Sequence, residues 1–370
     1  TGCVTDNPQP RVSYCLESDR QNVTLKKAVI SIGDWKKETD CQIAVPYEGS
    51  RLQPFTKYTV RVEAEDDAGE RAWASTEFET GRMDTIWSGR WITDGEYRFK
   101  EAKISPKTMT FRTRFSCEKE IASARLYVTA LGIYELLLNG EKVGQDYFAP
   151  GFTSYWNQLQ YQTYDVTEQV KDGGKLRILL GNGWYGGRFG FSAHEEKGYF
   201  GNAKKLIAEV VVTYADGTEE IIGTDETWQI ERSRITYASI YDGEQVDQTL
   251  EDLAVEPVIL CRTFEELAAA GKTDGQMVDD ISQPEKDEQI PRGHLTARYS
   301  LPVVVHEQMQ PQELIHTPKG EEVFDMGQNF AGIFTLRVHE ARGTKIHIQT
   351  GEVLQDGCFY NENLRTAKSE

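Results

Sequence analysis

Residues 126–140 read LYVTALGIYELLLNG, and this stretch decides the fold. Leu126, Val128 and Ala130 lie on one face of an extended chain, because side chains of a strand alternate with period two. The apolar run at 133–138 leads into Asn139-Gly140, a dipeptide that strongly favours two-residue hairpin turns. The stretch therefore predicts two successive strands, the second of which enters a hairpin turn.

The same pattern continues outward from this hairpin. Segments 206–214 and 219–222 flank a second turn dipeptide, Asp216-Gly217, and only 264–270 has a convincing helical pattern. Strand after strand with almost no helix is typical of an all-β sandwich. We predict a jelly-roll-like sandwich over residues 83–290.

Two further β units flank this sandwich. In residues 1–82, Tyr58, Val60, Val62 and Ala64 alternate on one face, and the segment from 52 to 73 looks like the latter half of a fibronectin type III module. In residues 291–370, strands are expected at 301–305, 322–324, 332–338 and 345–350. These are few for an independent sandwich, so we expect a partial one. The predicted fold class is all-β, as tandem β-sandwiches.

Composition narrows the choice of partner. The chain of 370 residues has a net charge of −18, which argues against a nucleic acid or an anionic membrane. Neutral substrates, including sugars, fit that charge and the aromatic content of 11%. Six scattered cysteines without a CxxC pair, and the lack of a visible signal peptide, weakly favour the cytoplasm.

The glycine-rich segment 181–190 reads GNGWYGGRFG. Five glycines in ten residues cost conformational entropy on folding, which is explained if the backbone must turn or approach another group closely. Trp184 and Tyr185 provide flat apolar surfaces beside an amide and a guanidinium. This composition predicts a binding loop on a β-scaffold.

Five motifs place the chain beside a known family. They read PGFTSY at 150–155, QYQTYDVT at 160–167, GNGWY at 181–185, YDGE at 241–244 and DMGQNFAG at 325–332. Their order resembles that in bacterial α-L-rhamnosidases of glycoside hydrolase family 78. The resemblance implies a modular enzyme in which β-sandwiches precede a helical barrel, and the barrel hydrolyses terminal rhamnose with inversion.

The resemblance also implies what this chain lacks. No acidic residue here matches the family's catalytic motifs, and the sequence ends before the barrel, so we assign no catalytic residue and expect no hydrolysis by these 370 residues alone. The implied partners are a rhamnose-containing carbohydrate and the C-terminal catalytic domain of the same polypeptide.

We expect sugar contacts from residues of the central sandwich that pair aromatic faces with polar groups, namely Tyr155, Asn182, Trp184, Tyr185, Arg188, Asp242 and Glu244. Some domains of the family resemble a rhamnose-binding module in which calcium bridges protein and sugar. The oxygens of Asn182, Asp242 and Glu244 are accordingly the expected calcium ligands, although no cofactor is required.

Other interpretations of the same residues stay open. The GNGWY segment is also typical of a tight turn whose Trp fills the mouth of the sandwich, and YDGE of a surface turn. These loops could equally support a catalytic barrel. The alternatives to a rhamnosidase region are therefore an autonomous carbohydrate-binding module, calcium-dependent or not, and a purely structural β-scaffold.

Overall fold

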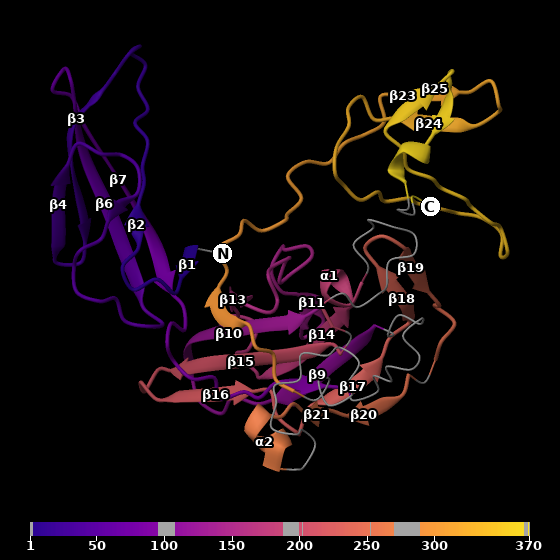
Figure 1. Ribbon diagram of the computed structural model, residues 1–370, viewed down its shortest axis with the longest axis horizontal. Helices are drawn as coiled ribbons and strands as arrows, with labels where there is room; N and C mark the ends of the chain where they lie inside the picture. Colours follow the sequence, from indigo (N-terminus) through magenta and orange to yellow (C-terminus); the bar gives the residue numbers. More distant parts are fainter. Residues whose placement is uncertain are drawn as a thin grey trace.

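The protein is represented by a computed structural model that describes residues 3–94, 108–187, 200–201, 203–251, 253–269, 289–365 and 369. Strands dominate these residues, and the described helices are short (Figure 1). They form successive β units along the chain, which confirms the predicted all-β class and the tandem sandwiches. No described helix is both long and apolar enough to cross a membrane.

The N-terminal sandwich is built from seven strands. They are β1 Cys3–Thr5, β2 Arg11–Val12, β3 Leu25–Ile32, β4 Trp35–Thr39, β5 Val45–Pro46, β6 Lys57–Asp66 and β7 Arg71–Thr80. Five form a sheet in the order β1-β7-β6-β3-β4, and β2 pairs with β5. Val60, Val62 and Ala64 are buried, as their alternation in β6 predicts, because one face of the sheet packs on a core that includes Val45.

One sheet of the central sandwich has seven strands. They are β8 Ile92–Thr93, β10 Ile121–Leu131, β13 Gln158–Asp165, β15 Lys205–Tyr214, β16 Glu219–Gly223, β21 Ile259–Leu260 and β22 His294–Ala297. The order is β21-β8-β15-β10-β13-β22, and β16 pairs with β15. The predicted turn at Asp216-Gly217 joins β15 to β16, and Gly217 has the positive φ of 80° that such a turn requires.

The second sheet of the central sandwich has six strands. They are β9 Met109–Phe115, β11 Ile133–Leu138, β12 Glu141–Lys142, β14 Gly174–Gly181, β17 Gln229–Arg232 and β20 Val255–Pro257. The order is β12-β11-β14-β9-β17-β20. Asn139-Gly140 joins β11 to β12, with positive φ at both residues, as the sequence predicts.

The main core lies between these two sheets. Leu126, Val128 and Ala130 are fully buried in one cluster with Phe111 and Ile178 of the opposite sheet. The other face of β10 is also covered, since Tyr127 is buried beneath Phe55 of the N-terminal sandwich, with ring centroids 5.5 Å apart. Simple alternation does not predict this second burial, because it depends on a neighbouring unit.

The strand β22 extends the central sandwich past the predicted limit at residue 290. It pairs in parallel with β13, so that His294 lies opposite Gln158 and Ala297 opposite Tyr161. Of the predicted helical segment, Phe264–Ala269 forms α2. The polar, acidic segment 271–289, which its composition predicts as a boundary loop, lies outside the described residues except for Gln289. The limits of the three predicted units stay predictions.

The C-terminal part has less sheet than expected. It contains two hairpins and a 3₁₀ turn, namely β23 Glu313–His316 with β24 Glu322–Asp325, β25 Val353–Gln355 with β26 Cys358–Tyr360, and η2 Glu362–Leu364. Among the described residues, 332–338 and 345–350 pair with no strand, so the predictions of strands there are wrong. The strand expected at 301–305 is also wrong, because only Val303 forms an isolated bridge, to Tyr147. The alternating residues Phe334, Leu336 and Val338 are half or more exposed, and no other described part of the chain covers them.

A buried ion pair joins the N-terminal and central sandwiches. The Arg82 guanidinium binds the Glu209 carboxylate, and both side chains are almost inaccessible to water, 3% and 0% exposed. The indole of Trp87 lies 4.2 Å from the guanidinium, and Gly89 N–H donates to the second Glu209 oxygen at 2.6 Å. These contacts fix the path of the connecting segment.

Asp6 forms a second connection between the two sandwiches. One carboxylate oxygen accepts hydrogen bonds from Met83 N–H and the Tyr161 hydroxyl, both at 2.7 Å. The other accepts from Ala297 N–H at 2.6 Å. One carboxylate therefore binds the connecting segment and two adjacent strands of the central sheet.

Candidate functional site

An aromatic cluster lies at one end of the central sandwich, where several loops meet. Its members are Phe148, Phe152, Tyr155, Trp156, Trp184, Tyr185 and Phe200. The ring centroids of Tyr155 and Phe200 are 4.9 Å apart, those of Tyr155 and Tyr185 are 5.3 Å apart, and those of Phe148 and Trp184 are 5.8 Å apart. Most pairs meet edge to face, the arrangement that aromatic quadrupoles favour.

The cluster has a buried layer and an exposed layer. Tyr155, Tyr185 and Phe200 are buried, whereas Phe148, Phe152 and Trp156 are 43%, 51% and 50% exposed. Trp184 is of intermediate exposure and contacts both Phe148 and Phe152. The buried rings support a surface that the exposed rings present to solvent.

Polar contacts hold the loop that carries Phe148 and Phe152. The Gln162 side chain accepts from the Tyr134 hydroxyl at 2.6 Å and donates to the Pro150 carbonyl at 3.0 Å. Burial raises the pKa of Tyr155, so its hydroxyl stays protonated and donates to the Gly151 carbonyl at 3.4 Å. The loop is therefore fastened to the sheet behind it.

The glycine-rich segment starts where β14 ends. Its short helix α1, Gly183–Gly186, begins with Gly183 at a φ of +53°. A side chain at Gly183 would place its Cβ 2.6 Å from the Ile133 side chain, so only glycine fits against β11 here. This close approach sets the position of Trp184 in the cluster.

Asn182 connects α1 to a hairpin that comes later in the chain. The hairpin consists of β18 Ile235–Ser239 and β19 Gly243–Val246. Asn182 is buried, and its Nδ2 donates to the Ala238 carbonyl at 3.1 Å. The hairpin is therefore held beside the glycine-rich segment.

Asp242 shapes the turn of this hairpin. Its Oδ2 accepts from the Tyr237 hydroxyl at 2.9 Å and from the Ser239 hydroxyl at 3.2 Å. Gly243 follows with a φ of +79°. Glu244 is exposed and lies opposite Ala238 in the ladder, so both side chains project from the same face of the hairpin.

The structure thus brings the predicted residues together in two neighbouring groups. Tyr155, Trp184 and Tyr185 belong to the aromatic cluster, while Asn182 adjoins the hairpin that carries Asp242 and Glu244. Arg188 lies outside the described residues. Their assignment to sugar binding stays a prediction, and the burial of Tyr155 and Tyr185 gives these two rings a packing role.

Sequence reasoning missed the exposed rings of Phe148, Phe152 and Trp156. Phe152 and Trp156 fall in or beside the PGFTSY motif, so a signal was present in their spacing around the turn. Phe148 could not be assigned from sequence, because its contact with Trp184 joins loops 36 residues apart.

The described residues contain no group of three or more His, Cys, Asp or Glu side chains that could hold a metal ion. Calcium binding by Asn182, Asp242 and Glu244 would need carbonyl or sugar oxygens to complete the ligand set. The Asp242 oxygen that binds Tyr237 and Ser239 is already used within the turn. The calcium prediction therefore stays a prediction.

Fold and site together define a multidomain β-sandwich protein with an aromatic loop surface on its central sandwich. Three family models match it. They are a Rha78A-like N-terminal immunoglobulin domain over residues 1–84, the α-L-rhamnosidase N-terminal domain over 119–307, and the bacterial α-L-rhamnosidase concanavalin-like domain over 315–370. The chain belongs to the α-L-rhamnosidase N-terminal domain family. Its first unit matches an immunoglobulin model, an architecture that fibronectin type III domains share.

Similar proteins agree with this family. An α-L-rhamnosidase of Alteromonas sp. is 29% identical over 88% of this chain and 34% of its own length, and one of Streptomyces avermitilis is 36% identical over 67% and 22%. The crystal structure of an α-L-rhamnosidase from Aspergillus terreus has a TM-score of 0.79 at 26% identity, covering 100% of this chain and 42% of that one. The chain thus spans between about a fifth and a third of the length of the curated relatives it matches.

Proposed function

We propose that this chain is the non-catalytic β-sandwich region of an α-L-rhamnosidase and that its aromatic cluster contacts a rhamnose-containing saccharide. The observation that carries the proposal is the exposed layer of Phe148, Phe152 and Trp156 beside the half-buried Trp184. A deoxy sugar has an apolar C–H face that packs on such rings. The adjacent hairpin offers Glu244 oxygens to sugar hydroxyls.

Binding is tested by calorimetry of the 370-residue chain with L-rhamnose, with and without calcium. We expect heat of binding, and an affinity about fivefold weaker for Phe152→Ala and Trp184→Ala, because each removes about 1 kcal/mol of ring contact. Ile43→Ala, on the N-terminal sandwich and 75% exposed, is the matched control that should leave binding unchanged. No heat and no shift of the melting temperature at millimolar sugar would remove the binding role.

The non-catalytic role is tested separately with an aryl α-L-rhamnoside. The 370-residue chain should give no turnover, because the residues assigned to binding form no acid and base pair on opposite faces of one sugar. Turnover that survives further purification and disappears on replacing a carboxylate of this chain would overturn the proposal.

The C-terminal part of the chain exposes many large apolar side chains. Among the residues that the structure describes, more than half of the exposed large apolar side chains lie between residues 299 and 354, for example Leu301, Ile333 and Phe334. Such density on one part of a protein marks an interaction surface. The partner we propose is the catalytic domain of the same polypeptide, whose packing would cover these side chains.

The comparison that tests this partner uses a natural longer chain carrying the catalytic domain. Amides of residues 332–350 should exchange with solvent at least tenfold more slowly in the longer chain, since covered backbone exchanges only through opening. Equal exchange in both chains would contradict the packing.

A further inference from the structure

The outer face of the N-terminal sandwich carries an exposed tryptophan among charged side chains. Cross-strand pairing aligns Val29 of β3, Glu63 of β6 and Trp73 of β7 in one row. Trp73 is 63% exposed, although a tryptophan buries more apolar surface than any other residue when it is covered. Trp73 does not contribute to the core of this sandwich, because that core lies on the opposite face of the sheet.

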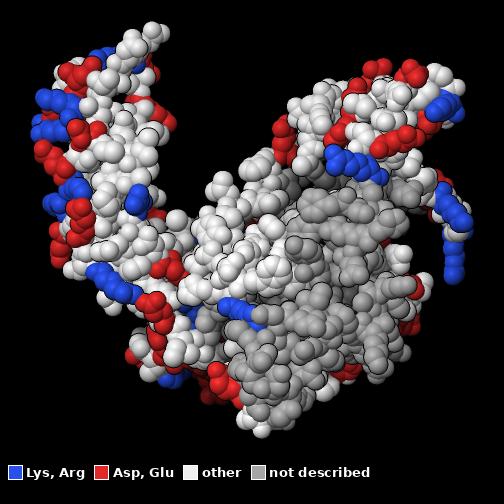
Figure 2. Space-filling view, viewed as in Figure 1, with Lys and Arg blue, Asp and Glu red and all other residues white. Residues whose placement is uncertain are grey.

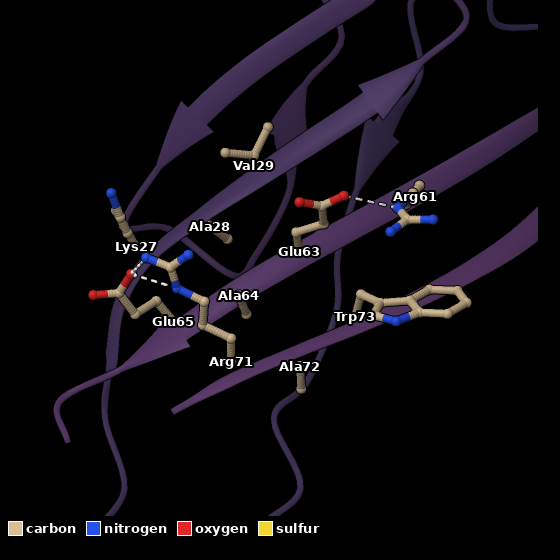
Figure 3. A pocket seen from close by; sticks show the side chains of 10 residues that line it. All are labelled: Lys27, Ala28, Val29, Arg61, Glu63, Ala64, Glu65, Arg71, Ala72 and Trp73. Atoms are coloured by element: carbon tan, nitrogen blue, oxygen red, sulfur yellow. Dashed lines mark hydrogen bonds and ion pairs between the residues drawn. The ribbon is translucent and has the colours of Figure 1, made fainter. Parts of the chain in front are cut away.

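The adjacent row holds the arginine that orients this ring. Arg61 is paired with Ser75 in the ladder, and its guanidinium carbon lies 4.3 Å from the centroid of the Trp73 ring. Its Nε donates to Glu63 at 2.9 Å, which fixes the plane of the guanidinium (Figure 3). Within the described part of the chain, the two Nη groups of Arg61 make no hydrogen bond or ion pair. One planar pair of donors is therefore held above a shallow depression.

The depression has a volume of about 270 Å³ and is lined by these side chains together with Lys27, Glu65 and Arg71. The Glu65 carboxylate is already neutralised, because Lys26 binds one oxygen at 2.7 Å and Arg71 the other at 2.9 Å. These contacts, the Lys26 bond first, hold the pKa of Glu65 below its usual range. Both Glu65 oxygens and one oxygen of Glu63 are therefore already bonded, whereas the Arg61 Nη groups are not.

The side chains that line the depression carry a net positive formal charge. Lys27, Arg61 and Arg71 outnumber Glu63 and Glu65 by one, whereas the whole chain carries a charge of −18. Basic and acidic side chains alternate along the N-terminal sandwich in the space-filling view (Figure 2). A site of local positive charge in an acidic protein favours a ligand that supplies anionic oxygens.

From these observations we infer that the depression around Trp73 and Arg61 is a second saccharide-binding site, which takes a sugar bearing a carboxylate. The pyranose ring lies against the part of the exposed Trp73 ring that Arg61 does not cover, on the side of the ring where Arg61 lies. The sugar carboxylate accepts two parallel N–H bonds from the Arg61 Nη groups, a geometry that guanidinium and carboxylate share. This site is independent of the aromatic cluster on the central sandwich, and the two sites can be tested one without the other.

The probe is a linear trimer of α-1,4-linked galacturonate, measured by calorimetry against the 370-residue chain. The matched ligand is the galactose trimer of the same linkage, which differs only in having hydroxymethyl groups for carboxylates. We expect the uronate trimer to bind at least about tenfold more tightly than the galactose trimer, and its affinity to fall as salt is raised.

Variants assign the binding to this face. Trp73→Ala and Arg61→Ala should each weaken uronate binding at least about tenfold, and Arg61→Lys should weaken it too, because an ammonium cannot form the two parallel bonds. Ile43→Ala is the control on the same sandwich, and Trp184→Ala the control on the central one; both should bind the trimer normally. Circular dichroism and melting temperature confirm that each variant is folded.

Three outcomes would overturn the inference: no binding of the uronate trimer at millimolar concentration, equal binding of the neutral trimer, or full binding by folded Trp73→Ala. None of these bears on rhamnose binding by the aromatic cluster. Loss of rhamnose binding in Trp184→Ala likewise leaves the uronate site untouched, so the two proposals fail separately.

Discussion

Individual residues show which charges matter to this fold. Glu209 and Arg82 are buried at the junction of two sandwiches, whereas Arg51 and Asp84 form an ion pair that is largely exposed. A buried pair recovers its desolvation cost only while both partners are present. Exposed pairs contribute little because water and salt screen them.

Replacing Glu209 with alanine should therefore lower the free energy of unfolding by about 3–5 kcal/mol, since Arg82 is left charged in a buried site. Asp84→Ala, the matched removal of an exposed carboxylate, should change it by less than about 1 kcal/mol. Urea denaturation of both variants measures the difference. Equal losses would show that water reaches Arg82 once its partner is gone.

Glu231 provides a pH dependence. Arg177 first and Arg112 second hold the pKa of this carboxyl below its usual range, through bonds of 2.5 and 2.6 Å. A lowered pKa in the folded state stabilises the protein at pH values above the unfolded pKa of about 4.3, and the stabilisation disappears as pH falls through the folded value.

The Glu231→Gln variant should consequently be less stable than the parent by about 1 kcal/mol at pH 7, a figure kept small because both arginines are partly exposed. The two proteins should converge as pH falls through the folded-state pKa of Glu231. Denaturation curves at pH 7 and pH 3 decide this. A constant gap across that range would mean that hydrogen bonding rather than charge sets the contribution.

At the scale of elements, the helix α1 depends on a single glycine. Gly183 and Gly33 have similar positive φ values, 53° and 56°, but an added Cβ meets Ile133 at 2.6 Å in the first case and nothing within 4 Å in the second. The two sites therefore separate steric contact from backbone strain.

Gly33→Ala should cost about 1–2 kcal/mol of unfolding free energy through its left-handed backbone alone. Gly183→Ala should cost about 1–3 kcal/mol more, because the new methyl group displaces α1 from β11. The same variant should weaken rhamnose binding, since Trp184 moves with the helix. If thermal denaturation shows equal losses of stability for the two variants, α1 can move away from β11 more easily than its contacts indicate.

The sequence predicts the elements whose partners are local. Turn dipeptides located the hairpins β11–β12 and β15–β16, whose strands pair across a short turn. Alternation located β10 as a strand, but its partners β13 and β15 lie far along the chain and were not predicted. The exposed rings of the aromatic cluster escaped prediction, since exposure depends on which loops meet at the end of a sandwich. The predictions of strands at 332–338 and 345–350 were wrong for a related reason. The apolar pattern of strands is present there, but no described strand pairs with these residues.

At the scale of the whole molecule, order should vary strongly along the chain. Both faces of β10 are buried, while the large apolar side chains at 330–338 are 44% exposed or more. Native-state hydrogen exchange should find the slowest amides in β10 and β15, and at least 100-fold faster exchange at 332–350, because unpaired backbone exchanges without global unfolding. Comparable protection in both regions would contradict the unpaired backbone described here.

The hydrogen bonds of Asp6 must form in a fixed order while the chain is being synthesised. Its bond to Ala297 links residues 291 positions apart. At about 5–20 residues per second, ribosomes need roughly 10–40 s to make the stretch between Met83 and Ala297. The nascent N-terminal sandwich can engage Met83 at once, while the second Asp6 oxygen remains hydrated throughout that interval. The last bond of the junction thus closes only after most of the central sandwich has left the exit tunnel.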